Sequence, residues 1–148
     1  MRIGWASMDI TPDRPVYLAG QMYVRVSRFV HDSITASALV LENGGEQAVF
    51  VSMDTVAVPD FLMAEIRCRL AEREGPDPDK VSLCATHTHT SSRFSVVGNE
   101  TLARYMGSGT IEAPEAPANI LCGEEGKKYL ADRIECLIMD AWENRREG

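Results

Sequence analysis

The sequence predicts a single α/β domain in which two main helices pack on a mixed β-sheet that contains a hairpin and a strand–helix–strand unit. Two apolar segments flank the tight-turn signal Asn43-Gly44-Gly45. A helical pattern separates residues 48–53 from a further apolar segment at residues 81–85, and residues 127–145 carry a helical apolar repeat. A chain of 148 residues can bury an ordinary core, so we expect one domain over residues 1–148.

Composition and charge exclude several classes of protein. Hydrophobic residues make up 45% of the chain, charged residues 25%, and the net charge is −7. A negative chain without a Lys/Arg cluster is not expected to bind nucleic acid or anionic lipid. The N-terminus lacks a signal-peptide pattern and no segment has transmembrane length, so we expect a cytoplasmic protein. Four cysteines form no C-x-x-C pair and are expected to be reduced: Cys68, Cys84, Cys122 and Cys136.

The first half of the chain is predicted to form mainly strands. Residues 3–6 predict a short strand, and residues 9–15 a loop, because two prolines and two aspartates oppose regular structure there. Residues 16–20 form a short apolar piece that ends in a glycine. Residues 33–42 and 48–53 predict the two strands of the hairpin.

A helix and a third strand follow the hairpin. Pro59-Asp60 opens the helix and Gly75-Pro76 ends it. Its apolar positions recur every four residues: Leu62, Ile66 and Leu70. The strand over residues 81–85 then follows a helical connection, so we expect it to lie parallel to residues 48–53.

The last third divides into a loop and a helix. Residues from the nineties to 126 are rich in glycine and proline and predict a long loop or lid, with a small helix near residues 100–105. Residues 127–145 predict the final helix. Its apolar stripe comprises Leu130, Ile134, Leu137, Ile138 and Ala141.

The segment Thr86-His87-Thr88-His89-Thr90, directly after a predicted strand, is the clearest candidate for a functional site. In extended backbone, alternate side chains point to the same side, so His87 and His89 can face one pocket. Neutral imidazole is a good zinc ligand. His-X-His also occurs by chance in loops, and zinc needs three or four ligands, so the pair predicts part of a metal site at most.

Other polar residues are candidates with competing interpretations. Asp54 follows the second hairpin strand and is expected either to bind the metal or support a ligand, or to cap its own loop. His31, beside Asp32, fits best as a partly exposed histidine at the entry to a strand. Three arginines could meet an anionic group of a substrate, but the default expectation is that they are solvated: Arg25, Arg28 and Arg93.

Several motifs occur in the order of one known family. They are Asp9-Ile10-Thr11-Pro12, Leu18-Ala19-Gly20, Val30-His31-Asp32 leading into Ala38-Leu39-Val40-Leu41-Glu42, Val51-Ser52-Met53-Asp54, and Ala85-Thr86-His87-Thr88-His89-Thr90. Over about the first ninety residues, and more weakly in the final helix, the chain resembles the N-terminal part of neutral/alkaline non-lysosomal ceramidases.

This resemblance implies a zinc amidase that cleaves the N-acyl bond of ceramide. His87 matches a zinc ligand of the family, and His89 matches an active-site histidine near the scissile amide. Gly20 matches the glycine of a turn whose backbone approaches the same pocket. The implied substrate is a small-molecule or lipid-like amide.

The chain also departs from the family pattern. Thr90-Ser91-Ser92 stands where the family has Ser-Gly-Pro, and Gln21 stands where tyrosine is frequent. No histidine follows His89. The family's other zinc ligands and its serine nucleophile lie further along than this sequence extends. The chain therefore resembles the N-terminal third of a ceramidase-like enzyme or a diverged short homologue.

Three alternatives bear on the function. In a metallo-β-lactamase motif Asp-His would stand where Ser91-Ser92 stand, and an amidohydrolase barrel needs more strands than this chain supplies. A non-catalytic domain that keeps the fold without a complete metal site remains the main alternative. We further expect the stripe of the final helix to be partly exposed or buried against another copy, which would favour a homo-oligomer.

Overall fold

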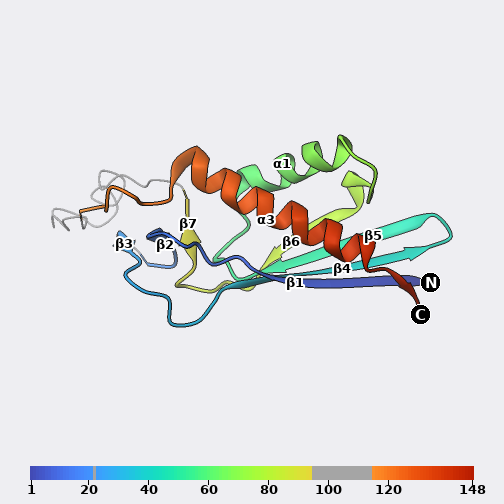
Figure 1. Cartoon of the computed structure of the whole chain (residues 1–148), viewed down its shortest axis with the longest axis horizontal. Helices are drawn as coiled ribbons and strands as arrows, with labels where there is room; N and C mark the ends of the chain where they lie inside the picture. The colour runs from blue at the N-terminus through green and yellow to red at the C-terminus, as the bar shows by residue number, and fades with distance from the viewer. Residues whose placement is uncertain (22, 95–114) are drawn as a thin grey trace.

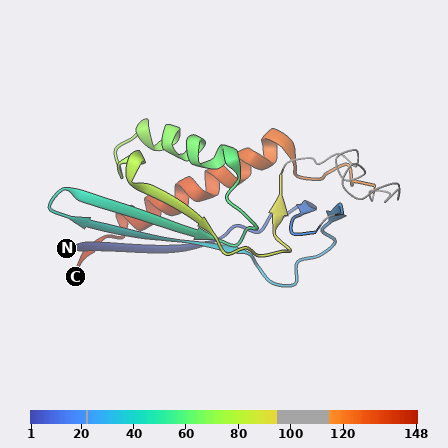
Figure 2. The ribbon, with the colours of Figure 1, turned by 180° about the vertical axis from the view of Figure 1, so that it is seen from behind.

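The computed structural model describes residues 1–21, 23–94 and 115–148. A five-stranded mixed sheet has the order β6-β5-β4-β1-β8, and a small three-stranded sheet has the order β3-β2-β7 (Figure 1). Both helices lie on the same side of the large sheet, and the two chain ends meet at one edge (Figures 1 and 2). This arrangement confirms the predicted α/β class with two main helices on a mixed sheet.

The predicted hairpin is present and pairs with the N-terminal strand. It consists of β4 (Thr35–Asn43) and β5 (Glu46–Met53), which are antiparallel. Gly44 and Gly45 have φ values of 60° and 90°, a left-handed turn that glycine adopts without strain. β1 (Arg2–Asp9) is longer than predicted because it pairs with β4 along its whole length. β8 (Arg146–Glu147) adds a short edge beside β1.

The strand–helix–strand unit is confirmed. Helix α1 (Asp60–Ala71) buries Leu62, Ile66 and Leu70, and a 3₁₀ turn η1 (Pro78–Lys80) leads into β6 (Val81–Ala85). Strand β6 runs parallel to β5, with Val49 beside Val81. The smaller sheet is built from β2 (Tyr17–Leu18), β3 (Arg25–Val26) and β7 (Ser92–Arg93).

Helix α3 (Gly123–Glu143) begins four residues earlier than predicted. Its first turn packs tightly on Phe94, since a Cβ added at Gly126 would lie 2.4 Å from the ring. The helix packs on β1 and β4 and contacts α1. Its whole apolar stripe is buried, with exposed fractions of 2% or less: Leu130, Ile134, Leu137, Ile138 and Ala141. The expectation of a partly exposed stripe is therefore wrong, and this argument for a homo-oligomer no longer holds.

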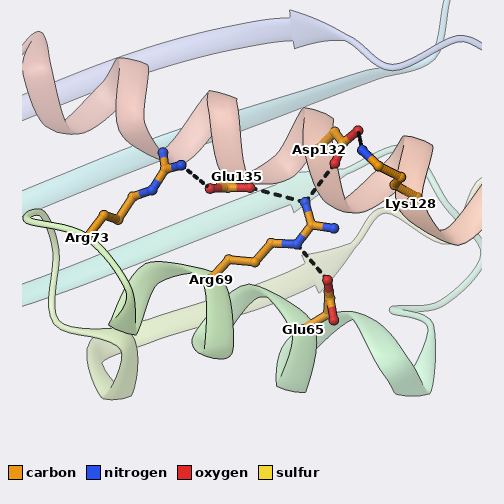
Figure 3. Close-up of polar contacts among 6 residues, drawn as sticks. All are labelled: Glu65, Arg69, Arg73, Lys128, Asp132 and Glu135. Carbon is orange, nitrogen blue, oxygen red and sulfur yellow. Dashed lines mark hydrogen bonds and ion pairs between the residues drawn. The ribbon is translucent and has the colours of Figure 1, made fainter.

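Ion pairs join α1 to α3 beside this core (Figure 3). The Arg69 guanidinium donates to Glu65 at 2.6 Å, to Asp132 at 2.7 Å and to Glu135 at 3.1 Å. Arg73 also pairs with Glu135, at 2.8 Å. These contacts hold the two helices together on the face of the sheet that they share.

Two remaining predictions can be compared with the structure, and a third concerns residues that the structure does not describe. All four cysteines lie in the described part of the chain and are free thiols. No helix of the described ranges combines the length and apolarity needed to cross a membrane. Most of the predicted loop or lid, including the small helix near residues 100–105, lies outside the described residues.

Candidate functional site

The histidine pair follows β6 at the carboxyl edge of the large sheet, where the parallel strands β5 and β6 end. The His87 and His89 rings lie 4.8 Å apart between centroids and are tilted by 74° in an edge-to-face arrangement. Both side chains belong to exposed residues. The two imidazoles therefore lie side by side, as the spacing predicted, but neither lines the pocket that is found on the threonine side of the motif. Strictly extended backbone is not what brings them together.

The backbone at His87 has a left-handed conformation, with φ of 67°, and His87 is the one non-glycine residue with positive φ in the described ranges. Such a conformation costs free energy and persists only where surrounding contacts impose it. Here Thr55 O accepts from His87 N at 3.0 Å and from Thr88 N at 3.2 Å, while Met53 O accepts from Thr86 N at 3.0 Å. The segment that follows β5 therefore fixes the backbone of the segment that follows β6.

The His87 ring is oriented by the same segment. Its Nδ1 lies 2.6 Å from the carbonyl oxygen of Val56. Because a carbonyl oxygen only accepts hydrogen bonds, Nδ1 carries the proton and neutral His87 keeps the lone pair on Nε2. Metal-binding histidines in proteins are usually held in this way by a backbone carbonyl or a carboxylate.

Ser91 fixes the other end of the motif, a role that no pattern in the sequence predicts. It is fully buried, its Oγ accepts from Val56 N at 3.1 Å, and its Oγ donates to Thr88 O at 3.0 Å. Its carbonyl also accepts from Ala19 N at 2.9 Å. The backbone groups of Val56 are therefore shared between the His87 ring and Ser91.

Gly20 lies directly against His89. It has φ of 92°, and a Cβ added there would lie 2.5 Å from the His89 Cα. Only glycine fits this conformation and this approach without a shift of the backbone. The structure thus brings Gly20 and His89 together, as the resemblance implied.

Arg25 connects the same two segments. Its Nη2 donates to Ala19 O and to His89 O, each at 2.8 Å. The expectation that Arg25 is simply solvated is therefore wrong. No local sequence signal marks this role, because Arg25 and His89 are 64 residues apart.

Asp54 contacts the threonines of the motif. Its Oδ2 accepts from Thr35 N at 2.9 Å and from Thr35 Oγ1 at 3.0 Å, and its Oδ1 accepts from Thr86 Oγ1 at 3.0 Å. Partial burial raises the pKa of Asp54, but the hydrogen bonds from Thr35 and Thr86 outweigh burial and hold the pKa below its usual value. These contacts show that Asp54 supports the segment after β6 that carries His87, while direct metal binding by Asp54 stays a prediction.

A pocket of about 740 Å³ lies on this threonine side of the motif. Asp54, Thr88 and Thr90 line it, together with the loop between β3 and β4, which includes His31. His31 Nδ1 lies 2.8 Å from Asp32 Oδ2, and the two side chains are 84% and 89% exposed. His31 is therefore an exposed histidine, in agreement with the interpretation favoured from the sequence.

The donor set of the site is small. In the described ranges, no group of three or more His, Cys, Asp or Glu residues is placed to hold a metal ion. His87 and His89 are the imidazoles brought together, so the arrangement can supply part of a coordination sphere.

Comparison with known proteins places the fold. No family model and no curated protein matches this sequence. A solved ceramidase complexed with C2 matches with a TM-score of 0.70 and 21% identity, over 99% of this chain and 22% of the ceramidase chain. The neutral ceramidase of Pseudomonas aeruginosa matches with a TM-score of 0.71 and 24% identity, again over 99% and 22%.

These matches confirm the resemblance at the level of the fold. The chain has the α/β fold of part of a neutral ceramidase. It spans about a fifth of the length of the solved ceramidase chains that it matches, since it covers 22% of each.

Proposed function

We propose that this chain forms the histidine-bearing part of a ceramidase-like, zinc-dependent hydrolase that acts on an N-acyl or amide bond. The observation that carries the proposal is the hydrogen bond between His87 Nδ1 and Val56 O at 2.6 Å, which leaves Nε2 free in an exposed imidazole pair. The fold shared with neutral ceramidase supports the substrate class. The substrate would be a small-molecule or lipid-like amide.

The residues present fit zinc as part of a site. His87 would bind the ion through Nε2, and Asp54 would keep its present role of holding Thr86. When bound, zinc would polarise the amide carbonyl and favour attack on it. His89 would donate a hydrogen bond to the oxygen of the reacting carbonyl. Gly20 would let the His89 backbone pack closely against its turn and so hold His89 in place.

Zinc titration by calorimetry tests this assignment. The chain should bind zinc weakly, because one or two candidate ligands supply fewer bonds than the three or four ligands of a complete protein site. His87→Ala should abolish the binding. The matched control is His31→Ala, which removes an exposed histidine away from the pair and should leave the binding unchanged.

Two outcomes would contradict the assignment. Zinc binding that survives His87→Ala would place the ion elsewhere. Tight, stoichiometric binding abolished by His87→Ala would instead show that this chain carries a whole site.

A non-catalytic domain is the second candidate. The small donor set of the described residues favours it. A chain that binds no zinc at any concentration, while keeping its fold by circular dichroism, would support this alternative over the hydrolase.

A further inference from the structure

The pocket on the threonine side of the motif lies where the small sheet meets the carboxyl edge of the large sheet (Figure 1). Asp54 and Thr88 line it from the segments that follow β5 and β6, and residues of β2, β3 and β7 line its other side. Its volume of about 740 Å³ is in the range of sites for small molecules. Neither His87 nor His89 lines it, so the pocket is separate from the proposed zinc site.

A chain of hydrogen bonds fixes the direction of the Thr88 hydroxyl. The pKa of Asp54 lies below its usual value, so this carboxylate is ionised at neutral pH and only accepts hydrogen bonds. Thr86 Oγ1 donates its single proton to Asp54 Oδ1 at 3.0 Å. Thr86 Oγ1 also lies 2.9 Å from Thr88 Oγ1, and because its proton is already used, Thr88 is the donor in that contact. The lone pairs of Thr88 Oγ1 are then all that this hydroxyl can offer to a ligand.

This polarity selects the kind of group that can face Thr88. A carbonyl or carboxylate of a ligand would meet an oxygen with no proton to share, and a polar group that loses water without gaining a partner costs free energy. An ammonium group carries three donors and no acceptor. It therefore matches the Thr88 hydroxyl, as does any other group that donates.

The charges around the pocket favour a cationic donor over a neutral one. Three carboxylates and two guanidinium groups line it: Asp13, Asp32, Asp54, Arg14 and Arg28. The Arg14 charge is already compensated, since its guanidinium lies 2.6 Å from Glu125. In the described ranges, no three His, Cys, Asp or Glu side chains are grouped to hold a metal ion, so a bare metal cation does not fit.

The remaining lining gives the ligand an apolar body. It comprises six large apolar side chains from β2, β3 and the segments beside them: Val16, Leu18, Val26, Phe29, Val30 and Ile34. Phe29 is 79% and Val30 57% exposed, so a ligand with an apolar surface would remove such side chains from water. A hydrated ion or a polyol would leave them solvated.

We propose that this pocket binds a small primary ammonium ion with a compact apolar body. The ammonium group donates to Thr88 Oγ1 near the charge of Asp54, and the apolar body lies against the side chains of β2 and of the loop between β3 and β4. The inference goes beyond the proposed hydrolase function and does not depend on zinc.

NMR titration of the ¹⁵N-labelled chain, with EDTA present to exclude metal, tests the inference. The probes are three compounds of one shape: 2-phenylethylammonium, 2-phenylethanol and 3-phenylpropionate. The ammonium ion should bind with a roughly millimolar Kd, as a ligand of this size can, and should shift the backbone signals of Thr88, Val16 and Ile34. The alcohol should bind at least about tenfold more weakly, and the carboxylate more weakly still, because a charge-assisted hydrogen bond is lost.

A fourth probe separates a free amine from the lysine of a protein. Nα-Acetyl-lysine methylamide carries the same ammonium group on a polar peptide body. It should bind at least about tenfold more weakly than 2-phenylethylammonium, because it buries less apolar surface in the pocket.

Variants of Thr86 test the hydrogen-bond chain itself, since Thr86 does not line the pocket. Thr86→Val removes the group that accepts from Thr88, frees the Thr88 proton, and should weaken binding of the ammonium ion at least about fivefold. Thr86→Ser keeps the hydroxyl and should restore wild-type binding. Ser82→Ala, which removes an exposed hydroxyl from β6 outside the pocket, is the matched control and should have no effect.

Several results would overturn the inference. They are an alcohol, carboxylate or lysine derivative that binds as tightly as the ammonium ion, signals that shift only outside the pocket, and the absence of binding at millimolar concentrations. Binding that is unchanged in a folded Thr86→Val variant, as judged by circular dichroism, would do the same. Loss of zinc binding in His87→Ala has no bearing on any of these measurements.

Discussion

At the scale of single residues, the candidate site depends on backbone positions that most side chains tolerate poorly. His87 adopts φ of 67°, and Gly20 adopts φ of 92° against the backbone of His89. Contacts from Thr55, Val56 and Arg25 hold these conformations. Strain of this kind clusters at functional sites because it presets the direction of a reactive group.

Substitution at Gly20 separates the effect of close packing from that of φ. Gly20→Ala should lower the free energy of unfolding by about 2–4 kcal/mol, since it combines strain at positive φ with a forced backbone shift. Gly45→Ala is the matched control, because Gly45 has φ of 90° and nothing within 4 Å of the added Cβ. It should cost only about 1 kcal/mol.

Urea unfolding of both variants, followed by circular dichroism, checks this expectation. Equal losses of unfolding free energy for Gly20→Ala and Gly45→Ala would show that the close approach of Gly20 to His89 does not contribute to stability. NMR spectra should also show shifted His89 backbone signals in Gly20→Ala alone.

At the scale of elements, α1 and α3 are joined by charges as well as by apolar contacts. Arg69 binds three carboxylates, and its side chain is 21% exposed (Figure 3). Burial raises the pKa of Asp132, but hydrogen bonds from Lys128 and Arg69 outweigh burial and lower it overall. A carboxyl group whose pKa is lower in the folded state stabilises that state at neutral pH, and this contribution is lost as the pH falls through the folded-state pKa.

Arg69→Met should therefore destabilise the protein in a pH-dependent way. We expect a loss of about 1–2 kcal/mol at pH 7, after allowance for solvent screening of partly exposed groups. The difference from the wild type should shrink as the pH falls through the folded-state pKa of Asp132, which is lowered. Arg67→Met, at an exposed position of the same helix, is the control. A loss that is the same at pH 7 and at a pH below the folded-state pKa of Asp132 would assign the effect of Arg69 to packing.

At the scale of the whole molecule, the described chain provides a rigid support for two imidazoles. Helices cover one face of the sheet and bury the entire apolar stripe of α3. The motif lies at the edge where β5 and β6 end, which is the common position of sites in parallel α/β units.

The isolated chain is expected to be inactive, because its described residues do not supply a complete set of metal ligands. With zinc present, the purified chain should hydrolyse a fluorogenic short-chain ceramide no faster than its His87→Ala variant. The described residues supply two imidazoles, and a catalytic zinc site normally has three protein ligands. Turnover that is present in the chain and abolished by His87→Ala would contradict this prediction.

Local chemistry was sufficient to predict much of the fold. Residues 81–85 were placed correctly as a strand, because an apolar run bounded by turn residues needs no distant information. Gly44-Gly45 specified the hairpin, and the apolar repeats specified α1 and α3. The spacing also predicted that His87 and His89 lie side by side, although a left-handed backbone at His87 produces this and not the extended backbone on which the prediction was based.

Only the tertiary structure decided what surrounds those elements. The contacts of Arg25 with His89, of Ser91 with Val56 and of Asp54 with Thr86 join segments 64, 35 and 32 residues apart. The covered stripe of α3 depends on β1 and β4, which lie more than eighty residues earlier in the sequence. A local sequence pattern shows which side chains must be buried or hydrogen-bonded. Which residues contact them depends on how distant segments of the chain pack together.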